Sequence, residues 1–195
     1  MPSSLIKGGM AAAGVGGVGL GGWAISNHIK SNNTVKAILV SKGHKLTSSL
    51  PTSEQGAAWE KALNTYKLEG IGDLQIQKGD VSATDIKNWC SENLGKQSND
   101  STLKKASRWC VLYSSFKDKL DEEGRVLETD LSSLQTKYNS LGSLTEEVKK
   151  VTPDSGSENE NGRKLKKWCE TMIHLSYRDD HAYQTFKGHC SKVSG

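Results

Sequence analysis

The dipeptide Trp-Cys occurs three times in this chain, as Trp89-Cys90, Trp109-Cys110 and Trp168-Cys169, and Cys190 is the fourth cysteine. Repetition of a pair of such uncommon residue types is the least random feature of the sequence. An even number of cysteines at paired spacings is typical of disulfide bonds formed in an oxidising compartment. The feature constrains the architecture of the chain and leaves its chemistry open.

The cysteines fall into two similar arrangements. The segment Ile86-Lys-Asn-Trp-Cys90 resembles Leu165-Lys-Lys-Trp-Cys169, and each is followed by one more cysteine, Cys110 or Cys190. We interpret them as two related helical hairpins that turn near Asn99 and Asp180. At a rise of about 1.5 Å per residue, the two cysteines of each hairpin lie almost level. Of the three possible connectivities, the spacing favours Cys90–Cys110 and Cys169–Cys190, each stabilising the fold by about 3 kcal/mol.

Apolar residues recur at helical spacing through most of the chain, which predicts a mainly α fold. A helix is expected to begin with a capping box of Thr52 and Gln55. Two further helices are expected from 101 to 116 and from Leu127 to Leu141. The sequence predicts a single α-helical domain over 51–195, a bundle of about five to seven helices. Ser, Asn, Gly and acidic residues make 151–162 a mobile loop within it.

Residues 1–26 contain an uncharged stretch rich in Gly, Ala and Val that is long enough to span a bilayer. We interpret it as a membrane anchor and residues 27–50 as a linker or stalk; a cleaved secretory signal and a Gly-rich tail are the alternatives. The lysines that follow the segment favour a cytoplasmic domain by the positive-inside rule. The cysteine pattern favours an extracellular domain instead, and we follow the cysteines.

No motif indicates catalysis, a cofactor or a metal. The cysteine spacings contain no zinc knuckle, and neither Cys190 with His189 nor Cys169 with His174 has the signature of a nucleophilic pair. The net charge is only +4. We read the basic clusters beside the tryptophans as solvated helix faces and expect no nucleic-acid partner.

The layout resembles that of the paralogous families of uncharacterised, membrane-anchored proteins of haemotropic mycoplasmas. The resemblance rests on the Gly/Ala/Val segment, on Trp59, Leu63 and Tyr66 at helical spacing, and on the Lys-x-Trp-Cys helices ending at Cys90 and Cys169. It implies surface exposure with antigenic variation and supplies no catalytic or binding residue.

These observations predict a non-enzymatic surface protein, anchored in the cell membrane, whose large domain is extracellular and contacts a host macromolecule. The alternatives are a membrane-tethered scaffold on the cytoplasmic side, or a thiol- or metal-dependent protein that uses Cys90, Cys110, Cys169 or Cys190. The redox state of the cysteines distinguishes the first from the others.

Overall fold

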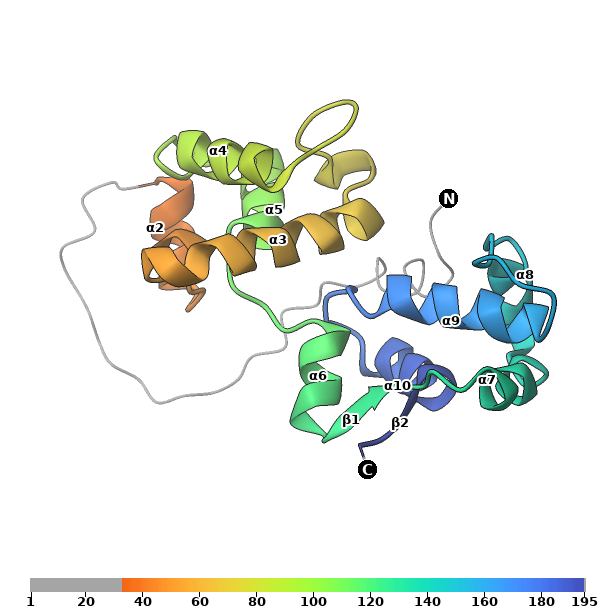
Figure 1. The fold of residues 1–195 in the computed structure, drawn as a ribbon. Helices are drawn as coiled ribbons and strands as arrows, with labels where there is room; N and C mark the ends of the chain where they lie inside the picture. Colours follow the sequence, from red (N-terminus) through yellow and green to blue (C-terminus); the bar gives the residue numbers. More distant parts are fainter. Residues whose placement is uncertain (1–32, 195) are drawn as a thin grey trace. The chain divides into compact units, whose positions relative to one another are not determined.

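The computed structural model describes residues 33–194 of the chain (Figure 1). These residues form two compact units, 33–112 and 113–194. The predicted single domain over 51–195 is therefore wrong, because each cysteine pair belongs to a unit that buries a core of its own. The predicted anchor, 1–26, lies outside the described residues. Within 33–194, no helix combines the length and the apolar character that a membrane crossing requires.

The first unit contains four α-helices among its described residues: α2 (Val35–Ser41), α3 (Thr52–Glu69), α4 (Ala83–Leu94) and α5 (Asp100–Trp109). Short 3-10 turns lie at Thr47–Ser49 and Gly72–Leu74. In α2, Val35 and Leu39 are fully buried. Residues 34–50 are therefore part of the folded unit, and the expectation of a stalk over 27–50 is wrong for them.

The core of the first unit is centred on Trp109, which is fully buried. Its ring meets the ring of Tyr66 edge to face at 5.0 Å, and its indole N–H donates to the carbonyl of Leu74 at 2.8 Å. The N-cap of α3 is Pro51 and makes no side-chain cap. Gln55 instead donates to the carbonyl of Leu50 at 2.9 Å, so the predicted capping box is absent.

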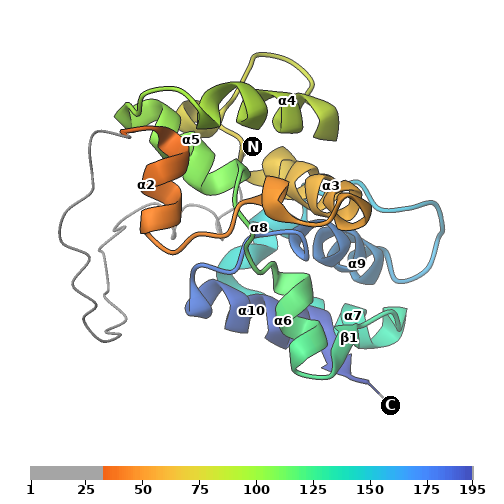
Figure 2. The same ribbon diagram turned by 90° about the vertical axis from the view of Figure 1, so that its left-hand side faces the viewer.

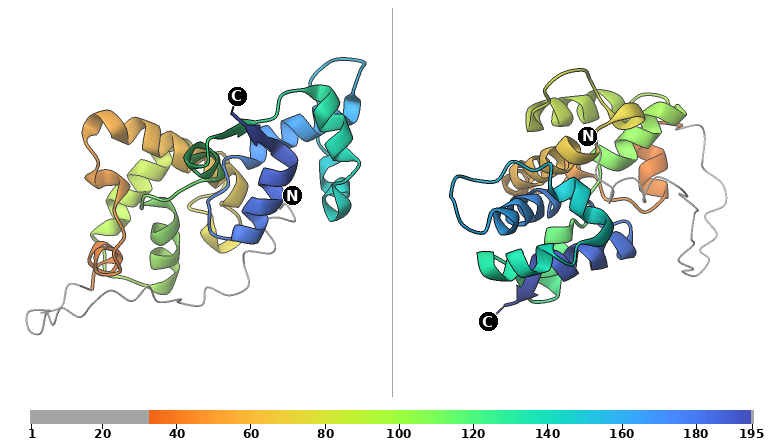
Figure 3. Two further views of the ribbon diagram at one scale, coloured as in Figure 1. Left: turned by 90° about the horizontal axis from the view of Figure 1, so that it is seen from below. Right: turned by 90° about the vertical axis from the view of Figure 1, so that its right-hand side faces the viewer.

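The second unit contains five α-helices among its described residues and one small antiparallel sheet (Figure 1). The elements are α6 (Phe116–Glu122), β1 (Arg125–Leu127), α7 (Leu131–Tyr138), the 3-10 turn Gly142–Leu144, α8 (Thr145–Val148), α9 (Glu160–Met172), α10 (Asp180–Cys190) and β2 (Ser191–Val193). Val126 of β1 stands opposite Lys192 of β2. In Figures 2 and 3, α7 runs beside α9.

Two predicted helices are shorter than expected. The helix predicted to run to 116 ends at Trp109, and Phe116 begins the separate helix α6 because Ser115 caps it with a reciprocal box to Asp118. The helix predicted from Leu127 starts only at Leu131, because Leu127 pairs with Ser191 in the sheet. The expected loop at 151–162 ends early, since α9 begins at Glu160.

The two units share one plan that extends well beyond the cysteines. Residues 34–46 (TVKAILVSKGHKL) correspond to residues 115–127 (SFKDKLDEEGRVL). Each segment is a helix capped by a hydroxyl side chain, Thr34 or Ser115, and then turns at a glycine with positive φ, Gly43 or Gly124. In this alignment Leu39 matches Leu120.

Backbone hydrogen bonds follow the same correspondence. Val35 N–H donates to the carbonyl of Lys96 at 3.1 Å, and its counterpart Phe116 donates to Leu175 at 2.9 Å. After the second cysteine of each unit the chain pairs with the end of this first segment. Cys110 accepts from Thr47 at 3.0 Å and Cys190 accepts from Glu128 at 2.8 Å. The helices α5 and α10 are likewise capped by matching side chains, Asn99 and Asp179.

Candidate functional site

The four cysteines predicted as site residues form two buried disulfides, one in each unit. Cys90 is bonded to Cys110 and Cys169 to Cys190, with Cα–Cα distances of 5.6 and 5.5 Å. This is the predicted connectivity, and none of the four is more than 1% exposed. No free thiol remains in the structure. Residues 33–194 also contain no cluster of His, Cys, Asp or Glu suited to a metal ion.

The tryptophans beside the cysteines have different roles. Trp109 and Trp168 are buried, and the indole N–H of Trp168 donates to the carboxylate of Glu147 at 2.7 Å. Trp89 remains partly exposed against the core of the first unit. Two of the three therefore serve as core anchors whose polar edge is satisfied by a hydrogen bond, as buried indoles require.

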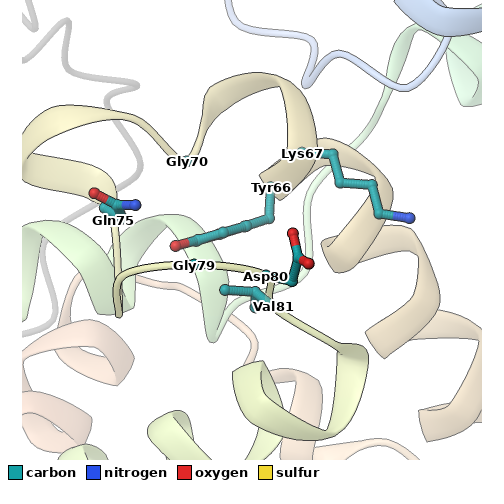
Figure 4. A pocket seen from close by; sticks show the side chains of 7 residues that line it. All are labelled: Tyr66, Lys67, Gly70, Gln75, Gly79, Asp80 and Val81. Carbon is teal, nitrogen blue, oxygen red and sulfur yellow. The ribbon is translucent and has the colours of Figure 1, made fainter.

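A pocket of about 360 Å³ lies between the end of α3 and the loop that follows it (Figure 4). Tyr66 crosses the pocket between Gly70 and Gly79, whereas Lys67 points away from it. The Tyr66 hydroxyl accepts from the backbone N–H of Ile76 at 2.9 Å. A side chain at Gly70 would clash with Tyr66, because an added Cβ would stand 2.8 Å from its ring. The Tyr66 side chain therefore has a structural role in this pocket, where it holds the loop.

Two further pockets, each of about 320 Å³, lie in the first unit. One faces Trp59, whose indole nitrogen is buried without a hydrogen-bond partner in the described chain. The other, which we call the α2–α5 cleft, combines two leucines with several charged side chains. Its lining consists of Leu39, Lys42, His44, Asp100, Leu103, Lys104 and Ser107.

A buried carboxylate with several hydrogen-bond donors lies at the small sheet of the second unit. Glu128 is 7% exposed and accepts from the backbone N–H groups of Thr129 and Asp130 at 2.9 and 3.0 Å. Ser133 and Lys192 also contact it, at 3.1 and 3.2 Å. These hydrogen bonds, that from Asp130 foremost, lower the pKa of Glu128 to about 2.

The hydrogen-bond and ion-pair partners of Glu128 indicate that this acid has a structural role. They belong to the start of α7 and to β2, so the carboxylate connects two segments that are distant in sequence. Nearby, burial and the ammonium of Lys137 lower the pKa of His189. Lys137 itself donates to the carbonyl of Ser191 at 3.1 Å. The sequence reasoning missed this cluster, since no local pattern connects residues so far apart.

Comparison with protein-family models, curated proteins and solved structures finds no match for the chain. The function of the chain is therefore inferred from the geometry of its described residues.

Proposed function

We propose that this chain is a non-enzymatic binding protein displayed on the outer face of the cell membrane. The observation that carries the proposal is the pair of buried disulfides, which take up every cysteine of the chain, one bond in each unit. Disulfides of this kind form and persist outside the reducing cytoplasm. The anchor in this proposal is the uncharged segment predicted within residues 1–26.

The chemistry of the pockets supports binding rather than catalysis. The charged residues at the pocket of Figure 4 are Lys67, whose side chain points away from it, and Asp80, and its lining contains no histidine, serine or thiol. The most perturbed carboxylate, Glu128, is occupied by its structural hydrogen bonds. In the α2–α5 cleft the hydroxyl of Ser107, a side chain of the kind that covalent catalysis uses as a nucleophile, donates to the backbone carbonyl of Lys104 at 2.9 Å. The proposed partner is a host macromolecule.

Labelling of intact cells tests the proposed location. Lys104 in the first unit and Lys149 in the second have side chains that are 57% and 53% exposed, so each unit carries a reactive marker. A membrane-impermeant amine reagent is applied to intact cells and, separately, to lysed cells. We expect both lysines to be modified equally in intact and in lysed cells. A cytoplasmic protein serves as the control and should be labelled only after lysis. Labelling of Lys104 and Lys149 only after lysis would overturn the proposal.

A further inference from the structure

The shared plan of the two units allows each surface of one to be compared with its counterpart in the other. The α2–α5 cleft of the first unit is bounded at its base by Leu39, which is fully buried, and by Leu103. In the second unit Leu120 takes the place of Leu39 and is equally buried. The other lining positions differ in size and charge, and these differences decide whether the cleft is open.

An aromatic ring fills the corresponding space in the second unit. Counting back from the second cysteine of each unit, Leu103 corresponds to Tyr183, which is only 1% exposed. The Tyr183 ring packs edge to face on Phe116 and on Tyr177, with centroids 5.4 Å apart in both pairs. Leu103 and Val35, the counterparts of Tyr183 and Phe116, are both smaller than the aromatic residues they match, so the first unit lacks the ring that occupies this position in the second.

An ion pair then covers the ring in the second unit. Lys187 contacts the carboxylate of Glu123 at 3.1 Å, and its ammonium stands 5.4 Å from the centroid of Tyr183. The counterparts in the first unit are Ser107 and Lys42, so the same pair cannot form there. The second unit closes the gap between its two helices with a ring and a carboxylate of its own, whereas the first leaves a pocket of about 320 Å³.

The charge around the open cleft indicates which ligand fits it. Lys42, His44 and Lys104 line it, against the single carboxylate of Asp100. Lys104 is already paired with Asp73 at 3.2 Å. Lys42, whose counterpart is an acid, is the cation most available to a ligand, because its ammonium meets no acid among the described residues. A cationic ligand would meet this ammonium with like charge.

We infer that the α2–α5 cleft binds a small aromatic carboxylate. Its ring would lie on the partly buried Leu103, the position that Tyr183 holds in the second unit, and its carboxylate would pair with Lys42. The inference deepens the proposed binding function by naming a ligand class. It is tested on the purified chain, so its failure is distinguishable from a failure of the proposed surface location.

Binding is measured by nuclear magnetic resonance on the oxidised full-length chain, titrated with 4-hydroxyphenylacetate. We expect saturable shifts of the backbone amides of α2 and α5 and no shifts in the second unit. Tyramine, which carries the same ring and an ammonium, serves as the ligand control and should cause no shifts. Shifts with both compounds, shifts spread over the two units, or none at all would overturn the inference.

Matched variants tie binding to the cleft. Lys42→Glu should weaken binding at least about tenfold, because a charge-assisted contact becomes a repulsion. Lys36→Glu changes the same charge on the exposed side of the same helix and should leave the affinity within about twofold. Both lysines are exposed, so both variants should fold. Equal affinity of the two variants would contradict the assignment.

A transplant of the second unit's residues gives an independent test. The triple variant Lys42→Glu, Leu103→Tyr, Ser107→Lys supplies the ring and the ion pair that close the gap in the second unit. We expect it to bind no 4-hydroxyphenylacetate. Retained binding in a folded variant would overturn the inference.

The ligand chemistry has two sources, a free metabolite or the carboxyl terminus of a peptide. A peptide that ends in tyrosine is compared with its amidated form and with 4-hydroxyphenylacetate. If the peptide with a free carboxylate binds more tightly than 4-hydroxyphenylacetate, the result supports the site and indicates a macromolecular partner. Preference for the small acid supports the site and indicates a metabolite. Equal binding of the amidated peptide would contradict the role of the carboxylate.

Discussion

Glu128 is a buried acid whose pKa changes strongly on folding. Its pKa falls from 4.5 to about 2 on folding, first because Asp130 N–H donates to it. An acid whose pKa is lowered on folding stabilises the folded state at pH values above the pKa that the acid has in the unfolded chain. This contribution, about 3 kcal/mol, is fully present at pH 7 and is lost as the pH falls from about 4.5 to about 2.

We therefore predict that Glu128→Gln lowers the stability of the second unit at pH 7 by about 2 kcal/mol, because a neutral amide accepts the hydrogen bonds from Asp130 N–H and Lys192 more weakly than a carboxylate does. The substitution should also flatten the loss of stability between pH 5 and pH 2. Urea unfolding measured across this range tests both effects. Glu158→Gln, in an exposed loop position, is the control and should change neither. An unchanged acid profile in Glu128→Gln would contradict the assignment.

At the level of single residues the sequence identified the cysteines and their pairing, and it could not identify Glu128. The pairing follows from helical rise within one hairpin, which is a local property. The partners of Glu128 include Lys192, which the chain brings near only when β1 pairs with β2. The contacts of the Tyr183 ring with Phe116 and Tyr177 likewise depend on the folded unit, because Phe116 is distant from Tyr183 in sequence.

The contact between α7 and α9 depends on a glycine. A Cβ added at Gly162 would stand 2.5 Å from the carbonyl oxygen of Leu131 and 3.0 Å from the amide nitrogen of Gln135. Both atoms are backbone, so neither can move aside without shifting α7. The helices therefore approach each other as closely as the missing side chain allows.

We predict that Gly162→Ala destabilises the second unit by about 2 kcal/mol, the usual cost of overpacking. Gly56→Ala is the matched control, since Gly56 lies inside α3 with nothing within 4 Å of an added Cβ. It should stabilise the first unit by about 0.5–1 kcal/mol, because alanine is the better helix former. Thermal unfolding of the two variants should show shifts of opposite sign. Shifts of the same sign would contradict this account of the helix contact.

At the level of elements, apolar spacing predicted the existence of helices better than their limits. Side-chain caps set the starts of two helices: Ser82 begins α4 through a capping box with Asp85, and Asp179 begins α10, beside the turn predicted near Asp180. Apolar spacing also continued across two chain turns, at 110–116 and 127–131, and there it predicted helix where none forms. Spacing reports which residues are apolar, while the turn itself is set by a cap at Ser115 and by a strand partner at Ser191.

At the scale of the whole molecule, residues 33–194 form two units with one plan, and each has its own disulfide. The prediction of a single bundle failed because the similarity between the units was recognised only around the cysteines. The correspondence of 34–46 with 115–127 is present in the sequence, where four positions are identical: Lys36/Lys117, Leu39/Leu120, Gly43/Gly124 and Leu46/Leu127. The interpretation of residues 27–50 as a stalk excluded the first of these segments from the folded part and so missed this correspondence.

Each unit should respond to the loss of its own bond. The Cys90–Cys110 bond closes a sequence separation of 20 residues, which stabilises by about 3 kcal/mol in the chain-entropy model. We predict that replacing both cysteines by alanine raises amide hydrogen exchange throughout 33–112 and leaves exchange in 113–194 unchanged. The reciprocal variant without Cys169 and Cys190 should show the reverse. Increased exchange in both units of either variant would contradict independent stabilisation.

The redox state of the cysteines in the cell tests the central claim most directly. The chain is isolated from its native membrane with thiols blocked at lysis, and its peptides are mapped by mass spectrometry without reduction. The account predicts two linked peptide pairs, one joining Cys90 to Cys110 and the other joining Cys169 to Cys190. Four blocked thiols, or pairs that join one unit to the other, would contradict it.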